Sequence, residues 1–204
     1  MRERPILFAG PMVRAILNGE KTVTRRVMKP FQVPTLDDDG RWYSVAQRDP
    51  KWGFAVDGDT ERECANALAA SLCCPHGAPG DRLWVRETYG DAGCRLTYRA
   101  DLDDGAHCMV KKWIPSIHMP RSASRILLKI TAVRIERLQD ISDEQALAEG
   151  VGVTKHAVGV KLTSPHDESV PRAMFRELWQ SINGTESWTA NPWVWVVEFK
   201  RITA

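Results

Sequence analysis

The feature that most constrains this fold is a set of strand-like segments that do not alternate with helices. The longest spans residues 125–138, where apolar residues alternate up to Ile130 and the phase then slips to Val133, as a bulge or strong bend produces. Residues 193–199 are almost continuously apolar, which predicts a central strand. Because no strand–helix–strand alternation is visible, we predict an α+β fold, a small mixed β-barrel with peripheral helices.

Three segments carry helix signals. Gly10-Pro11 begins a helix that ends at Gly19, since proline is favoured at a first helical position. Residues 142–145 form a capping box that opens a short helix closed by Gly150. Residues 171–182 predict an amphipathic helix with its apolar residues on one face.

The chain of 204 residues predicts a single domain, residues 1–204. Residues 30–78 are loop-rich and acidic, and they read as an insertion on a compact core. Within them we expect a hairpin, residues 41–46 and 52–56, and a helix near residues 60–72.

The net charge of only +2 hides an uneven distribution. Residues 1–30 hold seven basic and two acidic side chains, a local +5, and residues 111–137 hold seven basic and one acidic, a local +6. If these segments are neighbours in the fold, one face attracts anions. The alternative is that the cations only solvate strand faces.

No apolar run approaches the roughly 20 residues that cross a bilayer, and the N-terminal apolar stretch is too short for a secretory signal. We therefore expect a cytoplasmic protein with no membrane partner. The five cysteines lack paired zinc spacing, and a turn explains Cys73, Cys74 and His76, so reduced thiols without a metal or cofactor are favoured. The spacing alone leaves metal binding by these three residues open.

The densest polar cluster is residues 19–26, at a helix-to-strand turn. Taken alone, the pattern fits a turn followed by an exposed basic strand. A functional site needs a carboxylate, an aromatic platform and further cations from elsewhere in the chain. The candidates are Trp84, Arg86, Glu87, His118, Arg121 and Glu149.

Several stretches resemble ASCH-domain proteins of the PUA-like superfamily, especially members encoded by phages and prophages. The most family-specific piece is Gly-x-Lys-x-x-x-x-Arg, here Gly19, Lys21 and Arg26. The other matching stretches are residues 5–13, 79–88, 117–121, 124–135, 139–151 and 191–199. The resemblance implies a PUA-like β-barrel.

The resemblance also implies a cleft that binds RNA or a nucleoside. In such a cleft Lys21, Arg25 and Arg26 would contact phosphates while the face of Trp84 stacks a base. Trp193 and Trp195, two apart on one strand, share a face, and we expect at least one of them in the core.

Some small bacterial ASCH proteins are amidohydrolases that deacetylate N(4)-acetylcytidine with a Lys, a Thr three residues later and a Glu. The matching residues here are Lys21, Thr24 and Glu149. Because side chains alternate along a strand, this triad requires Lys21 to lie in the turn, outside the strand pairing. The chain departs from the small hydrolases at Arg25, which replaces an aliphatic residue, and in its long insertions.

Two alternatives remain open. Some ASCH relatives are described as ribonucleases, and the same basic cleft, with Lys21 or His118 handling protons, suits that reaction. The other alternative is a non-catalytic phage accessory protein that acts through protein interaction, which the near-neutral net charge favours.

Overall fold

A computed structural model describes residues 1–46, 54–152 and 168–202. Its main element is a five-stranded sheet with the strand order β1-β6-β9-β10-β2. The bounds are Glu3–Leu7 for β1, Val23–Val27 for β2, Arg82–Arg86 for β6, Leu127–Arg137 for β9 and Trp193–Ile202 for β10. β1 runs parallel to β6, and the other pairs are antiparallel. The prediction of an α+β fold is confirmed.

The phase slip predicted in the longest strand is a β-bulge. Ala132 of β9 faces Glu198 of β10, but the next pair along the ladder joins Ile130 to Phe199. Thr131 is therefore the extra residue, and the side chains after it change face. The central position predicted for the apolar strand is also confirmed, because β10 lies between β9 and β2.

The run of apolar residues in β10 serves two cores, one on each face of the sheet. Trp193 and Trp195 are both buried in the larger core, together with residues of α1, Gly10–Leu17. Val194 and Val196 pack in the second core against α3, Asp143–Ala148, and α4, Val170–Asn183. A strand with both faces covered has no need for polar alternation.

The predicted helix boundaries are confirmed. Pro11 lies in the first turn of α1, and Gly19 adopts a φ of +76° in the turn that leads to β2. Ser142 and Gln145 form both hydrogen bonds of a capping box at the start of α3, and Gly150, with a φ of +79°, follows its end.

The predicted insertion carries its own small sheet, β3-β4-β5, and a helix. Their bounds are Thr35–Leu36, Trp42–Val45, Ala55–Gly58 and, for α2, Glu61–Ala70, which confirms the expected hairpin and helix. Ala65 and Leu68 of α2 belong to the larger core, so the insertion packs against the main sheet.

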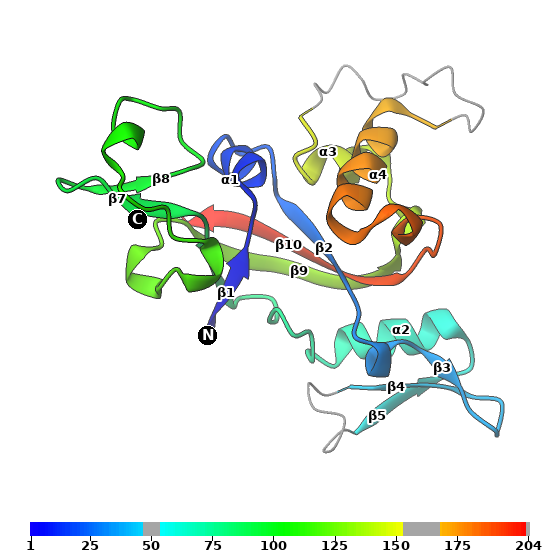
Figure 1. The fold of residues 1–204 in the computed structure, drawn as a ribbon. Helices are drawn as coiled ribbons and strands as arrows, with labels where there is room; N and C mark the ends of the chain where they lie inside the picture. Colours follow the sequence, from blue (N-terminus) through cyan, green and yellow to red (C-terminus); the bar gives the residue numbers. More distant parts are fainter. Residues whose placement is uncertain (47–53, 153–167, 203–204) are drawn as a thin grey trace.

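A third sheet, β7-β8, lies at the opposite end of the main sheet from α2 (Figure 1). β7 spans Tyr89–Asp91 and β8 spans Leu96–Tyr98. Short 3₁₀ turns occupy Pro30–Gln32, His107–Met109, Ser116–His118, Arg121–Ala123, Leu138–Asp140 and Thr185–Ser187. Across the described ranges, no helix is long and apolar enough to cross a membrane.

Candidate functional site

A cleft of about 620 Å³ lies where the end of β1, the edge strand β2 and the helix α4 meet. The segment Leu7–Gly10 forms one wall, and Thr24 to Val27 of β2 form another. Further residues that line it are Met12, Lys29, Glu87, Arg99, Glu149, Phe175, Leu178, Trp179 and Trp195. The cleft therefore combines a mainly apolar wall from α4 with polar side chains from the loops and the sheet.

Lys21 lies in the turn before β2, as the triad requires. Its backbone N–H donates to the carbonyl of Ala15, and the ladder with β10 begins only at Val23. Its ammonium Nζ donates to Oε2 of Glu149 at 2.7 Å and to the Glu149 carbonyl at 2.8 Å. Lys21 therefore lies outside the strand pairing, which meets the condition that the triad sets.

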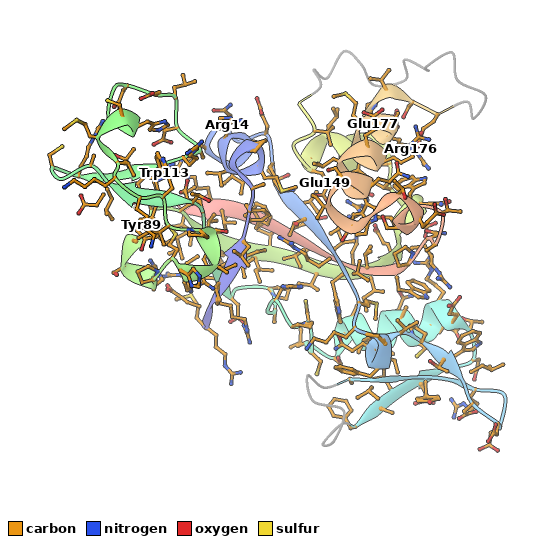
Figure 2. All side chains as sticks on the ribbon, viewed as in Figure 1. Arg14, Tyr89, Trp113, Glu149, Arg176 and Glu177 are labelled. Atoms are coloured by element: carbon orange, nitrogen blue, oxygen red, sulfur yellow. The ribbon has the colours of Figure 1, made fainter. Side chains whose placement is uncertain are left out.

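Gly150 allows this close approach between α3 and the turn that holds Lys21. Besides the left-handed φ, it has no room for a side chain, since a Cβ at this position would lie 2.8 Å from the Cβ of Ala15 and 3.0 Å from the Cβ of Lys21. Glu149, the C-cap residue of α3, is thereby held against the start of β2, between that strand and the helices α3 and α4 (Figure 2).

Arg25 completes a buried ion network around Glu149. Its guanidinium donates to Oε1 of Glu149 at 3.2 Å, to Glu136 at 3.1 Å and to Gln145 at 2.6 Å. The side chains of Lys21 and Arg25 are both 0% exposed. Two of the three cations expected to contact phosphates are thus already neutralised inside the protein.

Burial lowers the pKa of Lys21 below its ordinary value, because the charged amine is removed from water. The carboxylate of Glu149 opposes this change, and the positive charges of Arg26 and Arg25 add to it. The net direction is downward, toward an amine that gives up its proton more readily than an exposed lysine.

Thr24 and Arg26 point to the same side of β2, since they are two positions apart. Thr24 is buried and lines the cleft, and its hydroxyl has no hydrogen-bond partner within the described part of the chain. The guanidinium of Arg26 donates to the carbonyl of Leu7 at 2.8 Å and lies 5.5 Å from the ring centroid of Phe8. Arg26, on the edge strand β2, thus reaches the end of β1, which is the opposite edge of the sheet.

Glu87 also lines the cleft, but its carboxylate is occupied. Arg125 binds both oxygens, at 2.9 and 3.0 Å, while also pairing with Asp101 at 2.7 Å and covering the ring of Tyr98. Burial raises the pKa of Glu87, and the Arg125 charge opposes that rise. Glu87 therefore forms part of the cleft wall, but both of its oxygens are already bound by Arg125.

The remaining candidates do not line the cleft. Arg86 lies over the ring of Trp84 and donates to the carbonyls of Met119 and Ile117. His118 is exposed, and Arg121 pairs with Glu3 at 2.9 Å. The structure therefore brings Thr24, Arg25, Arg26, Glu87 and Glu149 together around the cleft. Lys21 does not line the cleft itself but is buried behind Glu149, to which it is hydrogen-bonded, and Trp84, Arg86, His118 and Arg121 lie apart from this group.

Sequence reasoning missed Lys29 and Arg99 as cleft residues, and it assigned Phe175 and Trp179 only to the buried face of α4. For Phe175 and Trp179 the helical spacing was a sufficient signal of burial. Lys29 directly follows the basic strand β2 and could have been included with it. No sequence signal connects Arg99, which follows β8, to a cleft built on β2.

All five cysteines lie in described residues, and none forms a disulfide. In the same described ranges, no group of three or more His, Cys, Asp or Glu side chains is arranged to hold a metal ion. Comparison with known proteins finds no matching family model, no similar curated protein and no similar solved structure.

Proposed function

We propose that this chain is an ASCH-type protein with a PUA-like barrel, whose cleft binds a nucleoside or RNA in the cytoplasm. The approach of the two sheet edges through Arg26 and Leu7 supports a barrel-like closure at that end of the sheet. The aromatic side chains Phe8, Phe175 and Trp179 give the cleft an apolar lining, which supports a ligand with a flat apolar part such as a base.

Within this binding function, we propose that the chain hydrolyses the amide of N(4)-acylated cytidine. The observation that carries the proposal is the buried 2.7 Å contact of Lys21 with Glu149, since Glu149 lines the same cleft as the unpaired hydroxyl of Thr24. A lysine that gives up its proton readily is what a threonine nucleophile requires, because a neutral hydroxyl attacks an amide poorly.

The proposed reaction proceeds in two steps. The Thr24 oxygen attacks the acetyl carbonyl carbon while neutral Lys21 takes the hydroxyl proton, which it then gives to the departing cytidine nitrogen as the C–N bond breaks. Water hydrolyses the resulting threonine ester to acetate and restores the hydroxyl. One water is consumed, and Glu149 acts as the positioning residue that holds the Lys21 amine.

The test is incubation of the purified protein with N(4)-acetylcytidine, with cytidine and acetate measured over time. Thr24→Val should remove turnover, because it keeps the volume of the side chain and loses the hydroxyl. Thr24→Ser should retain part of the activity. The matched control is Thr22→Val, the same change at an exposed threonine before the strand, which should leave the rate unchanged.

Lys21→Met probes the base separately. It removes the amine and keeps most of the aliphatic volume in the buried position. We expect folded protein, verified by its circular dichroism spectrum, without turnover. Absence of turnover in the wild-type protein, or equal rates in Thr24→Val and wild type, would refute the hydrolase proposal.

A further inference from the structure

The cleft offers hydrogen-bond donors that nothing in the described structure accepts. Nε of Arg25, Nε of Arg26 and Nε1 of Trp179 are all buried without a hydrogen-bond partner among the described residues. The three residues line the cleft. Counted over the whole residue, backbone included, Arg25 is only 4% exposed and Trp179 only 5%. Buried donors normally have acceptors, so a ligand that brings acceptor atoms to this cleft would satisfy them once the side chains turn toward it.

Three cationic side chains on the cleft wall are not paired with a carboxylate among the described residues. Arg26, Lys29 and Arg99 pair with no carboxylate in the described part of the chain, in contrast to Arg25 and its two glutamates. Each is instead held over an aromatic ring. The distances to the ring centroids are 5.5 Å for Arg26 over Phe8, 5.7 Å for Lys29 over Phe31 and 5.1 Å for Arg99 over Trp113.

An aromatic ring orients a cation without neutralising it. The cleft therefore has three positioned positive charges, whereas its carboxylates, Glu87 and Glu149, are already bound by Arg125, Lys21 and Arg25. This distribution of charge favours an anionic ligand over a neutral one.

One of the cations contacts the backbone segment Leu7–Gly10, and the chain neighbour of a second lies against it. Arg26 donates to the Leu7 carbonyl on one side, and Ala100, next to Arg99, lies against Gly10 on the other. The same segment leads into α1, whose N-cap residue, Ala9, has no side chain that can accept from the free N–H groups of the first turn. The N-terminus of α1 carries a partial positive charge, which adds to the positive potential of the three cations.

We propose that Arg26, Lys29 and Arg99 form a phosphate subsite and that the ligand of the cleft is a phosphorylated nucleoside rather than a free one. Phosphate supplies the negative charge and an acceptor oxygen for Nε of Arg26, whereas the base lies against the wall of α4, where its own acceptor atoms face Arg25 and Trp179. The identity of the base as cytosine rests on the proposed function, but the phosphate preference does not. The phosphate comes from a nucleoside monophosphate or from the backbone of RNA.

The experiment is calorimetric titration of the wild-type protein, at low ionic strength, with cytidine, with cytidine 5′-monophosphate and with a cytidine trinucleotide. Lys29 and Arg99 are solvent-exposed, so the contact of each with the phosphate should lie in the lower part of the range for hydrogen bonds to charged groups. Each contact should then raise the affinity for the phosphorylated ligand about tenfold. We expect the monophosphate to bind about 100-fold more tightly than cytidine, with a preference that weakens as salt is added. Tighter binding of the trinucleotide than of the monophosphate identifies RNA as the source of the phosphate, and the reverse identifies the nucleotide.

The variant Lys29→Gln/Arg99→Gln should lose most of this preference and keep its affinity for cytidine. The matched control is Arg2→Gln/Lys200→Gln, which removes the same net charge from exposed positions that do not line the cleft. Equal affinity for monophosphate and cytidine, no binding of either, or an equal loss in both double variants would overturn the subsite. Turnover of N(4)-acetylcytidine tests the hydrolase separately, so either proposal can fail while the other holds.

Discussion

Replacing Glu149 by Gln tests the buried ion network most directly. The Glu149 side chain is 5% exposed, and it accepts hydrogen bonds from Lys21 at 2.7 Å and from Arg25 at 3.2 Å. The amide keeps one acceptor oxygen and nearly the same shape. The change therefore removes a negative charge from between two buried cations without creating a cavity.

The magnitude follows from these distances. At an effective dielectric constant of about 20, the Lys21–Glu149 contact at 2.7 Å corresponds to about 6 kcal/mol and the Arg25–Glu149 contact at 3.2 Å to about 5 kcal/mol. Much of this is offset by the desolvation of the charges, and losing one member of a buried pair costs about 3–5 kcal/mol. Because the amide still accepts a hydrogen bond, we expect about 3 kcal/mol of lost unfolding free energy at mildly acidic pH.

The loss should depend on pH. Burial already lowers the pKa of Lys21, and the Gln variant lacks the carboxylate that opposes this effect. Between the folded-state and unfolded-state pKa values, the folded protein binds fewer protons than the unfolded chain, so stability rises with pH. With the folded-state pKa of Lys21 lowered further in the variant, this window extends to lower pH. Within the window, the slope of the unfolding free energy approaches about 1.4 kcal/mol per pH unit.

The assay is urea unfolding of wild type and variant at several values from about pH 6 to about pH 9. The matched control is Glu198→Gln, which removes a carboxylate that is 42% exposed and pairs with Arg134. That change should cost less than about 1 kcal/mol and show no comparable pH slope. If Glu149→Gln costs no more than the control, or if its cost is the same at every pH, the account of Lys21 as a buried amine held by Glu149 is refuted.

Two further predictions concern the elements around the cleft. Gly150→Ala should lower the melting temperature more than Gly152→Ala. Both glycines have a φ of +79°, but only at Gly150 would the new Cβ lie close to another side chain, 3.0 Å from the Cβ of Lys21. Equal melting temperatures of the two variants would contradict this close packing. Arg125→Met should cost about 3–5 kcal/mol in urea unfolding by leaving the buried Glu87 carboxylate unpaired. Burial raises the pKa of Glu87, so the loss should be smaller at pH 5 than at pH 8, where the carboxyl remains charged; the opposite trend would contradict this reasoning.

Local patterns predicted the secondary structure because each signal depends on neighbours in the chain. The capping box at Ser142, the glycine at position 150 and the slip in strand phase after Ile130 are all consequences of backbone geometry within a few residues. The hairpin and helix expected within residues 30–78 follow from the same kind of signal.

The membership of the site could be predicted only in part. Lys21, Thr24 and Glu149 were named because of a family resemblance, and the structure joins Lys21 to Glu149 although 128 residues separate them. Trp84 was the best stacking candidate in the sequence, but alternation along β6 carries it to the face opposite Leu83 and Val85, away from the cleft.

The sequence by itself determined the helices and the longest strands, the bulge in β9 and the burial of at least one tryptophan of β10; the structure buries both. Only the tertiary structure decided which charges face the cleft. Arg25 and Arg26 are adjacent, but opposite faces of β2 carry one into an ion network and leave the other without a carboxylate partner among the described residues. The near-neutral net charge counts paired and unpaired cations alike. A ligand in the cleft, however, is attracted only by the cations that no neighbouring carboxylate neutralises.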